Sequence, residues 1–555
     1  MTSIKEIKNR IKQYFSCSKS TGGVVTNNAN TSNQGTCTSN LSPKVKKYKR
    51  ILDSVHGTIF IESDYMEIIN TPYFQRLRRI EQSPIRSAFP SARHDRFIHS
   101  LGVFHIGSEV VNHLKDEIKN ISVFSGKEHE LEIICESYKI ACLLHDVGHS
   151  PFSHSFEKYF GSTEELCDLL AKSLKSDGFY DETWEKINKV KNNNGQKSLP
   201  KPHECVSAIL CCHEKLSKYI KRALQLEDKQ FKSYLEFIVR MITGIKYNDD
   251  TGINSIKNCF IELLHGEVDA DRIDYACRDT WAAGYSTTKV DARSLVSCIH
   301  IRKNPNKKDA YCVCFEKRAI AEIENMFGVK SFQNLHVFSH HTVVYDQYLL
   351  DRAVVRMAIN KYGGTEEEAM RHIFNVSSLM ENCDGDYHFL CDDYIIHLLK
   401  ADNNIYYKEW NSHKYNKVEL WKSAEEFLHL FPIAKGHLHK IAGFEDDIKN
   451  IIYSELSNYN LPNIEEGYER VNVEKINMQS TSSLSGLKIL IGNHVEDYDK
   501  IDIKYSGYPP NKLCFYYVYV ILPHEDMNGK KILPRKFKAE MCSMITQLIE
   551  TKYAS

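Results

Sequence analysis

The sequence lacks three features that would assign it to a class at once. Lys+Arg and Asp+Glu both total 72, so the chain has no basic excess of the kind that a general nucleic-acid coat needs. Its 17 cysteines include no C-x-x-C pair, which argues against a zinc knuckle or a redox dithiol. It has neither a secretory N-terminal pattern nor an apolar run near the roughly 18 residues of a membrane helix. We therefore expect a soluble, cytoplasmic protein with reduced thiols, with the nucleus as the alternative location.

What the sequence does contain divides it into three parts. Residues 1–44 are rich in Ser, Thr, Asn and Gly, which predicts a flexible segment. Residues 45–400 hold most of the helical periodicity, at 101–118, 136–146, 232–245 and 345–360, and a polar loop at 182–202. Residues 401–555 mix helical patterns, at 417–431 and 537–553, with the strand-like runs "LKILIG", "KIDIKY" and "LCFYYVYVIL". The predicted fold class is mainly α, with a smaller α+β unit at the C-terminus.

One short stretch, "KIACLLHDVGHSPFSHSFE" at residues 139–157, gathers three histidines and two acids beside an apolar run. Buried imidazole and carboxylate groups are costly unless a partner or an ion holds them. His145 and Asp146 end an apolar helical turn, and neighbouring helical side chains diverge by about 100°. These two residues can therefore bracket one ion, but they cannot complete its coordination shell.

The missing ligands have two good candidates elsewhere in the chain. His99 opens an apolar helical segment, and Asp271 lies in "HGEVDADRIDYACRD", an acidic stretch that also carries apolar and aromatic residues. Two imidazoles and two carboxylates suit Mn, Fe, Co, Ni or Zn, and suit Mg less well. A lone His-Asp pair is more often a surface or capping pair, so the metal hypothesis depends on these remote residues.

Six motifs in one order carry a resemblance to a known family. They are "DSVHG" (53–57), "TPYFQRLRRIEQ" (71–82), "FPSARHDRFIHSLGV" (89–103), "LLHDVGHSPFSHSFE" (143–157), "PHE" (202–204) and "VDADRIDYACRD" (268–279). Over residues 45–360 the sequence resembles the deoxynucleoside triphosphate triphosphohydrolase branch of the HD-domain phosphohydrolases. No segment resembles the sterile-alpha-motif domain that vertebrate members carry.

The resemblance implies a reaction and the residues that perform it. A divalent ion would be held by His99, His145, Asp146 and Asp271, and would activate water near neutral pH. Water would displace the deoxynucleoside 5′-oxygen at the α-phosphate and leave intact triphosphate. His203 would be the general acid, because imidazole titrates near pH ~6.5. His149 and His154 would hold the α-phosphate and the water, with Glu157 orienting one of them on the helix expected after Pro151.

The same resemblance implies how the dNTP substrate is bound. Arg96 and Arg272 would reach the phosphates, Tyr275 would pack on the deoxyribose, and Gln82 and Asp279 would bond the 3′-hydroxyl. The alternatives from sequence alone are a core tyrosine and a surface salt bridge. A homo-oligomer, dimer or tetramer, with a regulatory nucleotide between chains is also implied. Asn70 and Leu52 depart from the vertebrate guanine-reading pattern, which argues against activation by GTP, although Arg78 is retained.

Two other functions remain open at this stage. The protein can be another HD phosphohydrolase, acting on a nucleoside monophosphate, a cyclic dinucleotide or an alarmone, with extra histidines binding a second metal. It can also be a non-catalytic scaffold that binds nucleotides or single-stranded nucleic acid, although "KVKKYKR" (44–50) is its one basic cluster. Metal content and reaction products separate the three hypotheses.

Overall fold

The computed structural model describes residues 47–174, 179, 200–285, 289–382, 387–431, 443–459, 461, 463–479, 484, 486–501, 512–522 and 535–554. The predicted flexible segment 1–44, most of the polar loop at 182–202 and most of "KIDIKY" lie outside these residues. Helices dominate the part of the chain that is described, which confirms the predicted mainly α fold class.

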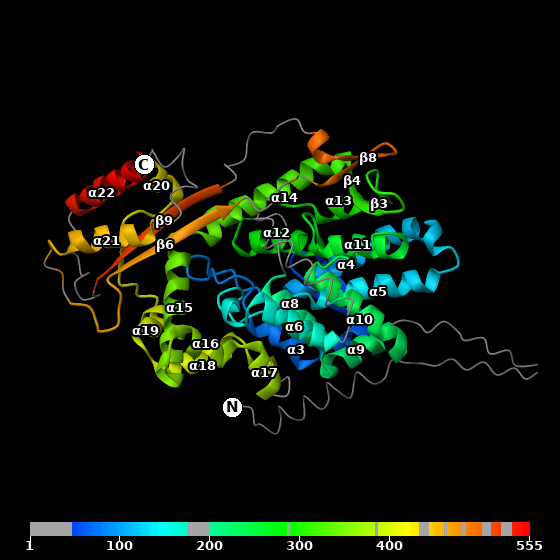
Figure 1. Ribbon diagram of the computed structural model, residues 1–555, viewed down its shortest axis with the longest axis horizontal. Coiled ribbons are helices and arrows are strands. Elements are labelled where there is room, and N and C mark those ends of the chain that lie inside the picture. The colour runs from blue at the N-terminus through cyan, green and yellow to red at the C-terminus, as the bar shows by residue number, and fades with distance from the viewer. Residues whose placement is uncertain are drawn as a thin grey trace, which may run out of the picture. The chain divides into compact units, whose positions relative to one another are not determined.

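A group of helices forms the body around residues 96–282 (Figure 1). In it α4 (Arg96–Lys119) packs on α5 (Glu128–Leu144) and on α12 (Ala270–Ala282), while α10 (Asp228–Thr243) packs on α5 and on α8 (Pro202–Cys212). The apolar faces that the periodicity marks meet in one buried core. The other helices of this body are α2 (Ser63–Ile69), α3 (Pro72–Gln75), α6 (Thr163–Leu174), α9 (Glu214–Leu224), α11 (Gly252–His265) and α13 (Ala292–Ser297).

Two long helices, α14 (Ile320–Gln333) and α15 (His341–Tyr362), follow this body and are separated by a π-helical turn at Asn334–Phe338. α14 packs on α12, and α15 packs on α16 (Glu366–Phe374), α18 (Asp392–Asp402) and α19 (Ile405–Ser412). The described residues after α15 also form α17 (Val376–Asn382), α20 (Ala424–Leu430), α21 (Glu445–Leu456) and α22 (Arg535–Ala554).

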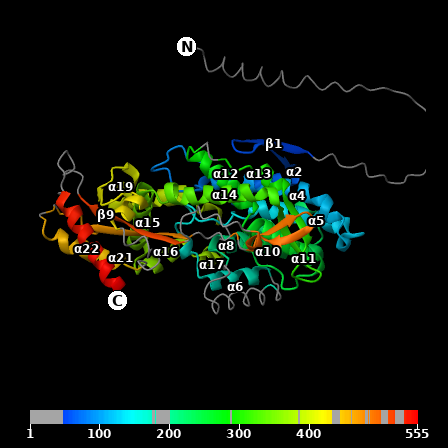
Figure 2. The ribbon, with the colours of Figure 1, turned by 90° about the horizontal axis from the view of Figure 1, so that it is seen from above.

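The strands of the described residues form three small sheets. The first is an antiparallel hairpin of β1 (Tyr48–Asp53) and β2 (Gly57–Glu62), which packs on α2 and α4 (Figure 2). The second has the order β3-β4-β7-β8, from Ile299–Lys303, Tyr311–Glu316, Lys488–Ile491 and His494–Asp497. The third has the order β5-β9-β6, from Lys417–Glu419, Lys512–Ile521 and Val471–Gln479.

The predicted division at residue 400 stays a prediction, but segments on its two sides are joined by hydrogen bonds. β7 pairs in parallel with β4, through Phe315 opposite Ile489. The Tyr345 hydroxyl on α15 donates to Glu409 on α19 at 2.9 Å. The C-terminal residues therefore build on the helical body and extend one of its sheets.

Three local predictions need correction. Residues 417–431 are not helical throughout, since Lys417–Glu419 pairs with β9 as β5 and the helix begins at Ala424. α5 ends at Leu144, so His145 caps the helix. The α-helix predicted directly after Pro151 does not form, because Phe152 and Ser153 have φ angles of 53° and 61°, and a 3-10 turn begins at Glu157.

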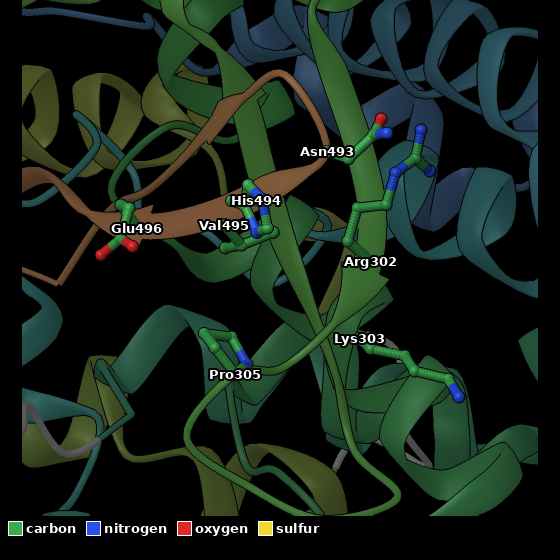
Figure 3. Close-up of a pocket in the computed structure, with 7 residues that line it drawn as sticks. All are labelled: Arg302, Lys303, Pro305, Asn493, His494, Val495 and Glu496. Carbon is green, nitrogen blue, oxygen red and sulfur yellow. The ribbon is translucent and has the colours of Figure 1, made fainter.

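A shallow pocket lies at the edge of the four-stranded sheet (Figure 3). Residues of β3, of the turn after it and of the β7–β8 hairpin line it, among them Arg302, Lys303 and His494. No helix within the described residues is long and apolar enough to cross a membrane.

Candidate metal and phosphate site

The loop that carries the histidines leaves α5 in a tightly packed turn. The imidazole Nδ1 of His145 lies 2.9 Å from the carbonyl oxygen of Cys142, one turn back in the helix. Gly148 rests against α8, where an added Cβ would lie 2.2 Å from the backbone nitrogen of Ser207. Glycine is therefore required at this close approach. The result is that His145, Asp146 and His149 face inward together.

The predicted ligands converge from three helices and this loop. His99 Nε2 lies 3.0 Å from Asp271 Oδ1 and 3.6 Å from Asp146 Oδ2. His145 Nε2 lies 3.4 Å from Asp146 Oδ1 and 3.6 Å from Asp271 Oδ1. Ligand atoms about 2.1 Å from an ion and 90° to 110° apart are about 3.0 to 3.4 Å from one another. His99, His145 and Asp146 each offer a ligand atom within 4.8 Å of the others, and Asp271 lies within 3.6 Å of both histidines, which suits a coordination shell.

In His99 and His145 the Nδ1 atom has a hydrogen-bond partner, and the Nε2 atom faces the carboxylates. Nδ1 of His99 is paired with Asp274 at 2.7 Å, and Nδ1 of His145 with the backbone. The buried Nε2 atoms of both rings have no hydrogen-bond partner. An imidazole with its proton on Nδ1 keeps a lone pair on Nε2 that can bind a metal ion. A divalent transition metal that displaces the proton from each Nε2 would find two imidazoles beside carboxylates, a ligand set that suits it.

The electrostatics of the cluster also favour a cation. The Arg96 guanidinium lies 2.5 Å from Asp146, and despite burial it holds the pKa of that carboxyl well below its usual range. Although burial opposes it, the carboxylates of Asp271 and Asp274 raise the pKa of His99 to about 10. The carboxylates thus attract positive charge into a buried position, which a metal ion would supply.

A second cluster lies beside the first. Glu157 lies 3.1 Å from Nδ1 of both His149 and His154, and 2.9 Å from Nδ1 of His203. The rings of His149 and His203 stack with centroids 4.1 Å apart. His149 is fully buried, whereas the side chain of His154 is 61% exposed. One ligand atom from each of the four residues lies within 4.8 Å of the others.

Burial and charge act together in this second cluster. Burial, reinforced by nearby Arg96, holds the pKa of His149 well below its usual value. Despite burial, His203 and His154 lower the pKa of Glu157. Glu157 is therefore a carboxylate that pairs with Nδ1 of His154 at 3.1 Å and with Nδ1 of His203 at 3.0 Å.

The predicted substrate residues lie in two places around these clusters. Asp279 accepts from His94 Nε2 at 2.6 Å, and Gln82 lies next to His94 through a backbone hydrogen bond of 3.1 Å. The Gln82 Oε1 atom is buried and unpaired. Arg272 and Tyr275 line a small pocket under α14. Contact of these residues with a substrate stays a prediction.

Arg96 is predicted to bind phosphate, but in the structure its side chain contacts other groups of the protein. Besides Asp146, its guanidinium bonds Ser153 Oγ at 2.9 Å and the carbonyl of Gln82 at 3.3 Å. The side chain is buried. In this structure Arg96 supports a metal ligand and the histidine loop.

Sequence reasoning missed several residues that support the site. Asp274 receives hydrogen bonds from His99, His56 and Arg278. Its only signal was its place in the motif at 268–279. Lys330 on α14 joins Arg272 in the small pocket, where burial and Arg272 lower the pKa of Lys330 to about 8. Lys330 stands in no motif, so no sequence pattern pointed to it.

Comparison with known proteins agrees with this geometry. The HD-domain family profile matches residues 96–232. An uncharacterized protein of Mycoplasma genitalium is 26% identical over 291 residues, which are 52% of this chain and 55% of that protein. The deoxynucleoside triphosphate triphosphohydrolase SAMHD1 of Gallus gallus is 26% identical over 317 residues, which are 55% and 44% of the two chains. This chain spans about half the length of these curated relatives.

A solved structure shares the fold. The phosphohydrolase of Bacteroides thetaiotaomicron aligns with a TM-score of 0.57 at 19% identity, over 86% of this chain and 100% of that one. Residues 96–232 thus match an HD domain, and the chain is similar to deoxynucleoside triphosphate triphosphohydrolases over part of their length. Members of this family are metal-dependent phosphohydrolases, and the clusters described above can hold the metal.

Proposed function

We propose that the protein hydrolyses deoxynucleoside triphosphates to the deoxynucleoside and triphosphate. One observation carries the proposal, the convergence of His99, His145, Asp146 and Asp271 beside a second cluster of histidines around Glu157. The first set would hold a divalent ion. When bound, that ion supplies Lewis-acid catalysis and an activated water.

The remaining steps belong to side chains of the second cluster. His149 and His154 hold the α-phosphate, with Glu157 fixing the ring of His154 through Nδ1. His203, held by the same carboxylate, gives its proton to the departing 5′-oxygen, so that the deoxynucleoside leaves as an alcohol. The positive charges of Arg272 and Lys330 balance the negative charge of the triphosphate.

The sugar is held where Tyr275 and Asp279 lie on α12. Tyr275 packs against the deoxyribose and excludes a 2′-hydroxyl, while Gln82 and Asp279 bond the 3′-hydroxyl. The unpaired Gln82 Oε1 supports this assignment, because a buried acceptor without a partner is costly in the absence of a ligand.

The reaction class is tested by incubating the purified protein with each of the four dNTPs and Mn²⁺, and by separating the products. We expect deoxynucleoside and intact triphosphate in equal amounts, with no product from ribonucleotides. The matched control is Asp146→Ala, which removes a metal ligand and should abolish both metal binding and turnover. Release of phosphate or pyrophosphate would contradict the proposed reaction.

A second candidate follows from the second cluster, whose four residues also have the spacing of metal ligands. In that case the protein is an HD phosphohydrolase with two ions that releases phosphate from another nucleotide. The variant His203→Ala separates the two functions. A general acid can be lost with the metal content unchanged and turnover reduced about 100- to 10,000-fold. Loss of one of two metals per chain, measured by elemental analysis, would favour the second candidate.

Assembly and regulation are also proposals that rest on the relatives. We propose a homo-oligomer whose assembly responds to a nucleotide other than GTP, because Asn70 and Leu52 differ from the vertebrate pattern. Light scattering of the protein with and without each nucleotide measures the mass of the assembly directly.

A further inference from the structure

The loop that carries the second histidine cluster is held from outside the HD domain. It runs from Val147 to Ser153 and connects the metal ligands to His154 and Glu157. Phe152 and Ser153 lie in the left-handed region, with φ angles of 53° and 61°. Non-glycine residues there cost about 1 kcal/mol or more each, so surrounding contacts must hold them in place.

Arg96 and the carbonyl of Gln82 bond the Ser153 hydroxyl, and the contact to Phe152 comes from residues 387–392, about 240 positions further along the chain. The Asp392 carboxylate is buried, with Oδ1 accepting from the Phe152 backbone N–H at 2.7 Å. Its Oδ2 accepts from the Glu81 backbone N–H at 2.9 Å. Asp392 thus joins the loop to the segment that contains Gln82.

Tyr387 of the same region and Arg76, which contacts that region, hold the other half of the loop. The Tyr387 hydroxyl donates to the Gly148 carbonyl at 3.2 Å. The Arg76 guanidinium lies over the Tyr387 ring, 4.6 Å from its centroid, and donates to the carbonyls of Val147 and His149 at 2.9 and 2.8 Å. Arg76 also bonds the carbonyl of Leu390. The loop therefore has hydrogen-bonded contacts to this segment on both sides of Pro151.

We propose that Asp392 is a positioning residue for His149, His154 and Glu157. It holds the strained loop in the conformation that places these side chains beside the metal ligands, and so makes turnover depend on the start of α18. The inference rests on the proposed function for its kinetic consequence. Asp392 acts through the backbone of Phe152 and touches no metal ligand, so metal binding should not depend on it.

The test compares Asp392→Asn with Asp393→Asn. An asparagine keeps one acceptor oxygen but offers an NH₂ group to the second backbone N–H, so one of the two hydrogen bonds is lost. Asp393 is the matched control, because it is adjacent, mostly exposed and paired only with exposed Arg79. We expect Asp392→Asn to lower kcat about 10- to 100-fold, with KM for dNTP within about twofold and metal content unchanged. Asp393→Asn should match the wild type.

Hydrogen exchange gives a measurement that does not require dNTP hydrolysis. In Asp392→Asn, peptides covering residues 147–157 should exchange roughly tenfold faster than in the wild type, while peptides from α4 and α5 are unchanged. If the wild type hydrolyses no dNTP, the proposed function is wrong. The exchange rates of residues 147–157 still show whether Asp392 holds the loop in place.

Three results would overturn the inference. They are a kcat for Asp392→Asn within twofold of the wild type, loss of metal from that variant, or unchanged exchange in the loop. If Asp392→Asn does not fold, Tyr387→Phe provides the second variant, since it removes only the hydroxyl donor to Gly148. Faster loop exchange with a reduced kcat in Tyr387→Phe would support the inference, and wild-type behaviour would overturn it.

Discussion

At the scale of single residues, Asp274 sets the orientation of a metal ligand without touching the ion site itself. It is fully buried, and its Oδ2 pairs with His99 Nδ1 at 2.7 Å, while Oδ1 pairs with His56 Nε2 at 2.6 Å. Arg278 bonds both oxygens and continues to Asp53 in the β1–β2 hairpin. This network fixes the tautomer of His99 and the direction of its free nitrogen.

We therefore expect Asp274→Asn to weaken binding of the divalent ion about 10- to 100-fold, because one oxygen cannot serve both histidines and Arg278. Competition with a chromogenic chelator measures the affinity without relying on turnover. Asp53→Asn is the control, since it disturbs Arg278 but leaves the contact between Asp274 and His99. Equal affinities in Asp274→Asn and the wild type would show that His99 needs no such support.

At the scale of elements, the position of the histidine loop depends on its contact with α8. An alanine at position 148 would place Cβ 2.2 Å from Ser207 N and 2.6 Å from Val206 C, both backbone atoms that cannot rotate away. Gly148→Ala should lower the free energy of unfolding by about 1–3 kcal/mol and displace His149 from its stack on His203.

Urea denaturation measures this effect, with Ser207→Ala as its control. That variant removes the hydrogen bond from Gly148 N to Ser207 Oγ, 2.8 Å long, but adds no atom to the contact. Its cost should be about 1 kcal/mol. If Gly148→Ala and Ser207→Ala were equally stable, the close approach of Gly148 to α8 would not determine the conformation of the histidine loop.

At the scale of the whole molecule, the four-stranded sheet is tied to the helical body through a charged group. Glu117, near the end of α4, pairs with His300 at 2.7 Å and with Arg302, and accepts from the Ile301 backbone at 2.8 Å. Burial alone would raise the pKa of Glu117, but these partners lower it to about 2.

This depressed pKa predicts a pH dependence of stability. A carboxyl of this kind stabilises the fold above its unfolded pKa of about 4.3, and the contribution is lost as the pH falls from about 5 toward 2. His300 is protonated in both folded and unfolded chains there, so it adds little to the slope. Denaturant titrations between about pH 6 and pH 3 should show a steeper loss in the wild type than in Glu117→Gln. Parallel slopes would mean that Glu117 is not paired in solution.

Part of this fold and site was predictable because it depends on local pattern. The apolar spacing of 345–360 lies within α15, that of 232–245 lies in α10 up to Thr243, and all but the last residue of the run "LCFYYVYVIL" lies in β9. The motifs also supplied the residues that converge around His99 and Asp146. The segment 417–431 was misjudged, because pairing with β9 outweighs the helical pattern of its first residues.

The sequence by itself determined the mainly α class, the family and the side chains able to hold a metal, because periodicity and motif order are local properties of the chain. Only the tertiary structure decided which groups support them. Asp274, Asp392 and Lys330 act on partners far away in sequence, and the pairing of β4 with β7 joins residues on opposite sides of position 400. Such contacts depend on the packed arrangement of the helices, which no short stretch of sequence encodes.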